Sequence, residues 1–303
     1  MDERRDLTPQ NGRPDIWHRL GRIFRLQNLG TLLFFLLNVG LMAAAFCPYG
    51  VPLWPLAAWY AVTVLISLSP VGEWLLCVFA GAREIKRLDI KVRLIPLLEV
   101  VFADARRAAP WMPASLRLKI IYDDAPNAYA VGRRTICVTS GILTLTDDEI
   151  MALFAHELGH IAYGHSTIQL LIGGGNVLIS GCLLVVKLIC WAVSGLLALM
   201  TLAARQPGGS VLAVLLGGLA SGLIWLWTRF CLLFLRWSMR QNELDADAFA
   251  CRIGYGWALA SLLDSRLWSP PPKGLLRGLY DTHPDSDERI ARLQELGVNY
   301  ARY

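Results

Sequence analysis

The sequence is poor in charged side chains: they make up 17% of its 303 residues, whereas hydrophobic residues make up 55%. Soluble domains carry about 25% charged residues, so this deficit excludes an ordinary soluble globule. Long apolar runs account for it, and runs of this length indicate helices that cross a membrane. The net charge of +5 does not indicate nucleic-acid binding, because many basic residues cluster beside the apolar runs.

Cysteine also lacks a pattern, since the seven cysteines are odd in number and include no Cys-x-x-Cys pair. This excludes a disulfide framework and a paired-cysteine metal site. Cys182, Cys190 and Cys231 lie within or at the ends of apolar runs, where we interpret them as small apolar fillers. Histidine is scarce, with five residues, so a closely spaced pair is informative.

Four apolar runs predict four transmembrane helices: residues 29–46, 51–68 with a softer tail to 80, 168–202 and 211–235. Ala43-Ala44-Ala45 resembles a signal-peptide cleavage site, but the long polar leader and the second run favour a retained anchor. Basic residues flank the first hairpin on both outer ends and are absent from its tip. By the positive-inside rule, both termini are predicted to be cytoplasmic.

This pattern predicts a mainly α integral membrane protein whose polar segments form one cytoplasmic α+β domain with a small β-sheet. The predicted parts are a basic leader (1–27), a transmembrane hairpin (28–80), the first part of the polar domain (81–169), a second hairpin (170–235) and the second part of that domain (236–303). Lys187 lies inside the third run. It either faces the bundle interior or snorkels to the interface.

Within the polar segments, local patterns predict short strands at 118–122, 128–131 and 135–139, with a turn at Gly132-Arg133. An apolar and basic helical pattern over 84–108 suits a helix at the membrane surface. A short helix is predicted at 286–296, and a helix break at 173–175.

The most informative stretch is His-Glu-Leu-Gly-His at 156–160. Thr146 and Glu149 form a capping-box pair that predicts a helix starting just before it. The four-residue spacing puts His156 and His160 on one helix face, where both imidazoles can bind one Zn²⁺. Glu157 follows the first histidine directly and can take a proton from a bound water. The alternative is a helix that carries two histidines by chance.

A catalytic zinc needs a third protein ligand. A metzincin would place Gly and His where Tyr163 and Ser166 stand, so that class is excluded. His165 is five residues from His160 and points to another face, so we assign it a structural role.

Glu243 is the leading candidate for the third ligand, and Asp247, one turn later, can hold a ligating histidine by its other ring nitrogen. The alternative is a solvated acidic face made of Glu243, Asp245 and Asp247. The residues give no account of Asp245.

With these paired motifs, the chain resembles the HtpX membrane metalloproteases and the related CAAX prenyl proteases, which are gluzincins. Two N-terminal spans, Asn127-Ala-Tyr-Ala, and His283-Pro with Arg289 agree with the resemblance, and four spans match HtpX better. It implies zinc ligation by His156, His160 and Glu243, and a zincin-type domain with Glu157 as the general base. It further implies substrate binding at Asn127, Ala128, Tyr129 and Ala130, and oxyanion stabilisation by His283.

The expected function is therefore a membrane-bound zinc endopeptidase that cleaves membrane or misfolded proteins and binds one Zn²⁺ per chain. The substrate would pair with an edge strand near residues 127–131. The expected location is a bacterial inner membrane, with the active site cytoplasmic. The alternatives are a site-specific peptidase of the prenyl-protein-processing type, which would need an enclosed chamber, and a scaffold with a structural zinc, which would need a fourth Cys or His.

Overall fold

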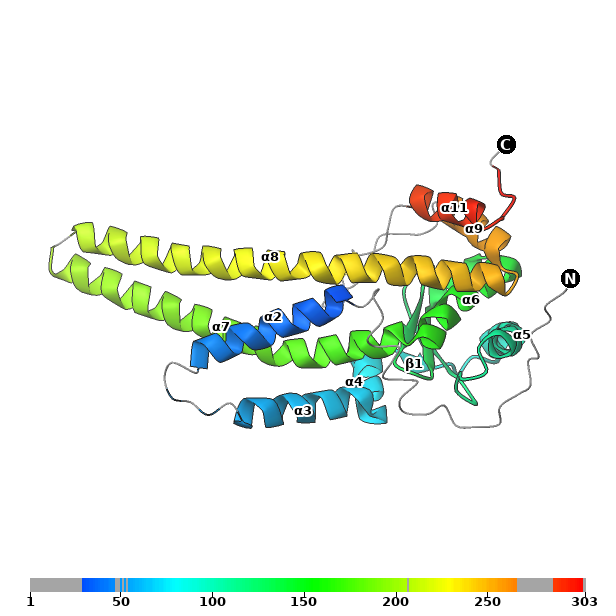
Figure 1. Cartoon of the computed structure of the whole chain (residues 1–303), viewed down its shortest axis with the longest axis horizontal. Helices are drawn as coiled ribbons and strands as arrows, with labels where there is room; N and C mark the ends of the chain where they lie inside the picture. The colour runs from blue at the N-terminus through cyan, green and yellow to red at the C-terminus, as the bar shows by residue number, and fades with distance from the viewer. Residues whose placement is uncertain are drawn as a thin grey trace, which may run out of the picture. The chain divides into compact units, whose positions relative to one another are not determined.

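The computed structural model describes residues 29–46, 50, 52, 54–205, 207–265 and 286–301. The predicted basic leader and His283 lie outside these residues. The described chain is mostly helical with a small mixed sheet (Figure 1). Its elements are α2 (Leu29–Phe46), α3 (Trp54–Leu68), α4 (Pro70–Phe79), β1 (Arg83–Glu84), α5 (Leu88–Ala108), β2 (Arg117–Ile121), β3 (Ala128–Val131), β4 (Thr135–Thr139), a 3₁₀ turn η3 (Ser140–Thr144), α6 (Asp147–Tyr163), α7 (His165–Ala203), α8 (Pro207–Arg252), α9 (Gly256–Asp264) and α11 (Ser286–Glu295).

The chain divides into two compact units. The sheet unit contains Leu68–Leu170 and Met239–Tyr303, and the apolar-helix unit contains Leu29–Ser67 and Leu171–Ser238. The divisions fall within α7 and α8, so each of these helices contributes residues to both units.

Two helices in the described residues are long and apolar enough to cross a membrane, Gly181–Ala203 of α7 and Gly217–Arg252 of α8. The bent pair Ala57–Ile66 and Pro70–Phe79 adds a third span if it counts as one, and α2 is apolar but shorter. The second predicted run is interrupted because Ser69 caps α4, accepting hydrogen bonds from the backbone N–H groups of Val71 and Gly72. Two to three candidate spans thus stand where the sequence predicts four.

Small side chains allow close helix packing in the apolar-helix unit. A Cβ on Gly30 of α2 would lie 2.2 Å from the carbonyl oxygen of Phe234 in α8. Four residues further along α8, Ser238 Oγ accepts a 3.0 Å hydrogen bond from Thr31 Oγ1. These contacts hold α2 against α8.

Large apolar side chains on α7 point outward, as expected of a helix in lipid: Leu184, Leu188 and Leu199 are each more than half exposed. Lys187 on the same helix is also exposed. An exposed position does not match the predicted place inside the bundle, and snorkelling to the interface stays a prediction.

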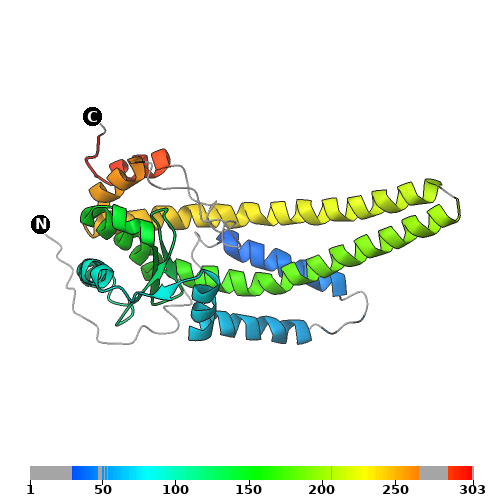
Figure 2. The same cartoon turned by 180° about the vertical axis from the view of Figure 1, so that it is seen from behind.

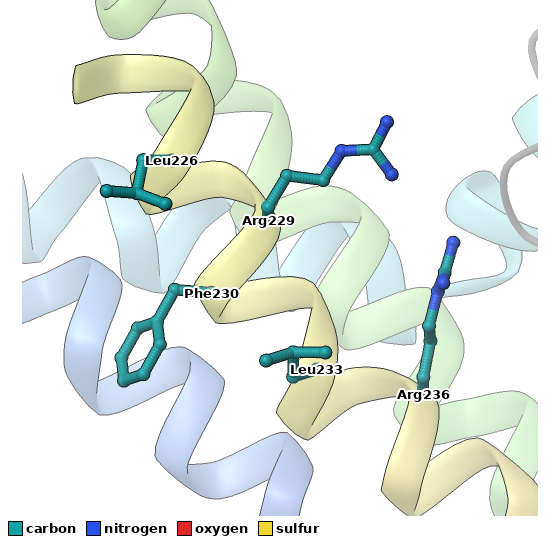
Figure 3. A pocket seen from close by; sticks show the side chains of 5 residues that line it. All are labelled: Leu226, Arg229, Phe230, Leu233 and Arg236. Atoms are coloured by element: carbon teal, nitrogen blue, oxygen red, sulfur yellow. The ribbon is translucent and has the colours of Figure 1, made fainter. Parts of the chain in front are cut away.

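A shallow groove runs along α8, lined by Leu226, Arg229, Phe230, Leu233 and Arg236 (Figure 3). The Arg229 guanidinium also lies over the Trp225 ring, 5.3 Å from its centroid. The groove contains no acidic residue, histidine or cysteine, so it offers none of the usual side-chain ligands of a metal ion.

The sheet unit contains a four-stranded sheet in the order β1-β2-β4-β3. β2 and β4 are parallel, while β1 and β3 pair antiparallel with β2 and β4, respectively. The three predicted strands are confirmed, and β1 was missed because two residues carry no alternating pattern. β4 is buried along its whole length, and β3 is an edge strand because it stands last in the strand order.

α6 lies at the centre of this unit and packs against α5, α9 and β3 (Figure 2). α5 contributes a buried stripe at helical spacing, made of Ile90, Leu94, Leu98, Val101 and Ala105. The predicted helix over 84–108 is therefore confirmed as part of the core. Its predicted location at a membrane surface stays a prediction.

The ends of α6 follow from local sequence. Thr146 Oγ1 accepts a hydrogen bond from the Glu149 backbone, and the Glu149 carboxylate accepts one from the Thr146 backbone, so the predicted capping box is confirmed. Gly164, with a φ of 78°, ends the helix in the left-handed region. The predicted break at 173–175 is wrong, because α7 continues through those glycines.

We expect Thr146→Ala to lower the free energy of unfolding by about 1 kcal/mol, because the substitution leaves a backbone donor of α6 uncapped. Thermal unfolding of the full chain in detergent checks this. Thr201→Ala is the control, since Thr201 donates to a carbonyl within α7 and caps nothing. Equal melting temperatures for the two variants would contradict the capping role.

Candidate metal centre

α6 places the two motif histidines side by side in the interior of the sheet unit. His156 is fully buried and His160 is 7% exposed. Their Nε2 atoms are 3.2 Å apart, one helical turn separating the residues as the spacing predicts. The Nδ1 atom of each ring is left for other partners.

Glu243 of α8 completes the group. Its Oε2 atom lies 3.4 Å from His156 Nε2, and its Oε1 atom lies 3.4 Å from His160 Nε2. Among the described residues, these three form a group whose ligand atoms lie close enough together to hold a metal ion. The structure thus brings the predicted third ligand to the histidine pair.

The spacing of the donor atoms fits a small metal ion. A tetrahedral ion with bonds of about 2.0–2.1 Å separates its donors by about 3.3–3.4 Å. The two Nε2 atoms are 3.2 Å apart, and each lies 3.4 Å from a different oxygen of Glu243; with one ligand atom taken from each residue, all three atoms lie within 4.8 Å of one another. Two imidazoles and a carboxylate therefore stand where such an ion needs them, and no fourth protein donor converges on the group among the described residues.

A close helix contact allows this convergence. Gly159 lies between the two histidines, and a Cβ there would be 2.9 Å from the Cα atom of Ala246 in α8. Ala246 in turn is three residues beyond Glu243. Glycine at 159 and alanine at 246 thus let the two backbones approach at the point where the candidate ligands of α6 and α8 meet.

Asp247 and Arg289 support His156 from behind. Asp247 Oδ1 lies 2.8 Å from His156 Nδ1, as predicted for a residue that holds a ligating histidine. Arg289 of α11 donates two hydrogen bonds to this carboxylate, of 2.6 and 2.7 Å. Arg289 is 1% exposed, so its buried charge is paired with Asp247 in a bidentate ion pair.

Sequence reasoning gave Arg289 no role in the site. The sequence feature that points to this residue is its spacing: Arg289 lies four residues before Leu293, on the same buried face of α11. A charge at such an apolar position indicates a buried partner. The partner, Asp247, lies 42 residues away in sequence and could be identified only from the fold.

These charges set the pKa values of the site. Burial lowers the pKa of His156, but the carboxylates of Asp247 and Glu243 outweigh it and raise the value to about 9. Burial would raise the pKa of Asp247, yet Arg289 and His156 hold it below its ordinary value. At neutral pH the metal-free site therefore combines a protonated His156 with an ionised Asp247.

Glu157 lies between the histidines and the sheet. Its Oε2 atom accepts a 2.6 Å hydrogen bond from the backbone N–H of Ala130 in β3. Burial raises the pKa of Glu157, against the opposing influence of His160 and His156. A carboxylate with a raised pKa is a better proton acceptor near neutral pH than one in water.

The predicted substrate-binding residues lie at the start of the edge strand. Asn127 is 8% exposed, and its Oδ1 atom accepts a 2.8 Å hydrogen bond from the backbone N–H of Ala128. Ala128 is buried, whereas Tyr129 and Ala130 are partly exposed. The structure thus places this strand beside Glu157. The predicted oxyanion residue His283 lies outside the described residues.

The predicted structural residue His165 lies at the start of α7, 3% exposed. Its Nδ1 atom is 3.3 Å from Nδ1 of His160. Asp245, which sequence reasoning left without a role, lies on the far side of His165, with its Oδ2 atom 4.0 Å from Nε2. Both residues therefore belong to the surroundings of the metal-ligand group.

Comparison with known proteins gives a consistent picture. The family model for peptidase family M48 matches residues 97–297. A protein named protease HtpX homolog from Tropheryma whipplei (strain Twist) is 30% identical over 252 residues, covering 73% of this chain and 78% of the relative. The protein of the same name from Neisseria meningitidis serogroup C is 30% identical over 227 residues, covering 66% of this chain and 72% of its own length.

Among solved structures, the chain is similar to Ste24p of S. mikatae, with a TM-score of 0.48 and 15% sequence identity. The match covers 91% of this chain and 64% of the Ste24p chain.

We expect Gly159→Ala to weaken metal binding, because the added methyl group forces α6 away from α8 and separates the histidines from Glu243. Overpacking of this kind also costs about 1–3 kcal/mol of stability. Metal content after purification and the melting temperature report the two effects. Gly218→Ala on α8 is the control, because a Cβ there meets no atom within 4 Å. Wild-type metal content in Gly159→Ala would contradict the argument.

Metal binding should depend on pH because His156, with a pKa of about 9, must lose its proton to become a ligand. We expect the apparent affinity to rise about tenfold per pH unit between about pH 6 and 8. Calorimetry in buffers of different ionisation enthalpy should show at least one proton released per ion bound. An affinity that stays constant over this range would contradict a protonated His156.

Proposed function

The chain belongs to peptidase family M48, and from this premise we propose that it is a membrane-bound zinc metalloendopeptidase. The observation that carries the proposal is the convergence of His156, His160 and Glu243, whose ligand atoms lie within 4.8 Å of one another, with Glu157 on the same helix as the histidines. The long apolar helices agree with the membrane location.

Zinc is the ion that this donor set suits best. Two imidazoles and one carboxylate from the protein, with one position left open, are the ligands of catalytic zinc sites. A structural zinc is closed by a fourth protein ligand, and the described residues bring none to the group. When bound, zinc would lower the pKa of its water to about 7 and polarise the scissile carbonyl.

Glu157 would act as the general base. It takes a proton from the attacking water while the water oxygen bonds to the carbonyl carbon of the peptide. The carbon–nitrogen bond then breaks, and Glu157 passes the proton to the leaving amine nitrogen. The buried position and raised pKa of this carboxyl suit both transfers.

Asp247 and Arg289 would hold His156 in its orientation during these steps. Asp247 holds His156 by Nδ1, which leaves Nε2 directed at the ion. Arg289 is engaged with Asp247, so we assign it to holding that carboxylate. Oxyanion stabilisation by His283 is part of the proposal by resemblance alone.

The substrate would bind as an extended segment along β3, near Asn127–Val131. Pairing through the backbone is tolerant of side chains, which suits cleavage of membrane or misfolded proteins in quality control. The alternative is a site-specific peptidase of the prenyl-protein-processing type. Such a peptidase would need an enclosed chamber, and the two to three candidate spans in the described residues are few helices to surround one.

The location that we propose is a bacterial inner membrane with both termini and the active site in the cytoplasm. The support is the distribution of basic residues at the outer ends of the apolar runs and their absence from the tip of the first hairpin.

Two substitutions separate ligand from base. Glu243→Ala removes one of three protein ligands, so zinc content and cleavage should fall together. Glu157→Ala leaves the three ligands in place, so zinc should remain while cleavage of an unfolded membrane protein falls by about 10²- to 10⁴-fold. Metal analysis and cleavage assays, with and without a chelator, measure both effects.

The matched control is Glu99→Ala, which removes an exposed carboxylate from α5 and should change neither zinc content nor cleavage. Full zinc in Glu243→Ala, or efficient cleavage by Glu157→Ala, would overturn the assignment of that residue.

A further inference from the structure

The two candidate ligand histidines are supported differently. Both direct Nε2 toward the metal-ligand group, so each ring has Nδ1 left over. Nδ1 of His156 faces the carboxylate of Asp247 at 2.8 Å. Nδ1 of His160 faces another imidazole instead, Nδ1 of His165 at 3.3 Å. A carboxylate also faces that second imidazole: Asp245 Oδ2 lies 4.0 Å from His165 Nε2.

His165 is held firmly in this position. It is the first residue of α7, directly after the left-handed turn at Gly164. The ring is 3% exposed and lies 5.6 Å, centroid to centroid, from the ring of Tyr163. The next residue, Ser166, donates a 2.5 Å hydrogen bond to the carbonyl of Gly132 in the β3–β4 turn. The residues on either side of His165 thus restrict the backbone that carries its ring.

The proton positions follow from the direction of the rings. A neutral imidazole that binds a metal through Nε2 carries its proton on Nδ1. His160 would then donate from Nδ1, so Nδ1 of His165 must be the acceptor. A neutral His165 that accepts at Nδ1 carries its own proton on Nε2, the atom that faces Asp245. Each of the two imidazoles thus requires one tautomer, and the two requirements agree, with the N–H of His165 facing the Asp245 carboxylate.

We propose that Asp245 and His165 form a relay that orients His160 as a metal ligand. His165 fixes the ring of His160 through the Nδ1 contact, and the negative charge of Asp245 favours the His165 tautomer that can accept. At 4.0 Å the carboxylate acts through its charge, since the distance exceeds that of a direct hydrogen bond. Both are positioning residues, because neither belongs to the metal-ligand group.

The relay differs from the support of His156 in its expected strength. Asp247 is fully buried and paired with Arg289, whereas the side chain of Asp245 is 27% exposed. The charge of Asp245 is therefore partly screened by solvent. Most of the effect should come from His165, with Asp245 contributing a smaller part through it.

The inference rests on the proposed function, since it assumes that the group binds zinc, and the test reads metal affinity in the full-length protein. His165→Phe keeps an aromatic ring of similar size and removes the acceptor, so zinc affinity should fall about 10- to 100-fold. Asp245→Asn should cost about three- to tenfold. His165→Asn restores an acceptor close to the former Nδ1 and should retain most of the affinity.

A double variant tests whether Asp245 acts through His165. If it does, His165→Phe/Asp245→Asn should lose no more affinity than His165→Phe alone. Losses that multiply would overturn the relay. The visible spectrum of Co²⁺ bound in place of zinc should change in His165→Phe and stay close to wild type in His165→Asn.

The melting temperature of the metal-free protein separates this role from general packing. The matched control is Asp264→Asn, which removes the charge of an α9 carboxylate that accepts a hydrogen bond from Tyr300 and should leave zinc affinity unchanged. Wild-type affinity in His165→Phe would overturn the relay, even if the melting temperature falls. Should His165→Phe fail to fold, wild-type affinity in Asp245→Asn would overturn it instead, and a loss there with retention in His165→Asn would support it. Absence of zinc binding by the wild-type protein would overturn the proposed function itself.

Discussion

The candidate site depends on one close contact between two helices. α6 carries the histidines and α8 carries Glu243, and their backbones meet where Gly159 faces Ala246. A larger side chain at either position would move the carboxylate away from imidazoles that lie 3.4 Å from it. Interiors are packed too densely to absorb such a shift elsewhere. The smallest residue of the motif thus sets the distance on which the metal-ligand group relies.

Around that contact, the sheet unit buries several ionisable groups. Glu157, Glu243, Asp247 and Arg289 are each less than 9% exposed. Such groups are costly to bury unless they are paired, and here each has a partner on another element. Arg289 joins α11 to α8, and Glu157 joins α6 to β3. The ion pairs and hydrogen bonds that define the site therefore also connect the helices and the sheet around it.

Much of this arrangement could be predicted from the sequence because its signals are local. The capping box at Thr146 and the four-residue histidine spacing need only the geometry of one helix. The strands around Gly132 likewise follow from short patterns. Asp247 could be predicted as a partner of a ligand because it lies one turn from Glu243, whereas Arg289 could not, because it lies 133 residues from His156 in the sequence. The helix break at Gly164 was misplaced for a different reason: one left-handed glycine ends a helix, whereas a run of glycines inside an apolar helix does not have to.

The hydrogen bond between Ala130 and Glu157 links the edge strand to the carboxylate that we propose as the general base. A backbone N–H has one proton to share, so a peptide carbonyl that pairs with Ala130 competes with the Glu157 carboxylate for it. Under the proposed binding along β3, a substrate that wins this competition would leave Glu157 Oε2 without its backbone donor when a scissile bond is close by. Without such a chain, the hydrogen bond keeps the base engaged with the protein's own strand. Strand occupancy and the availability of the base are thus coupled by a single proton.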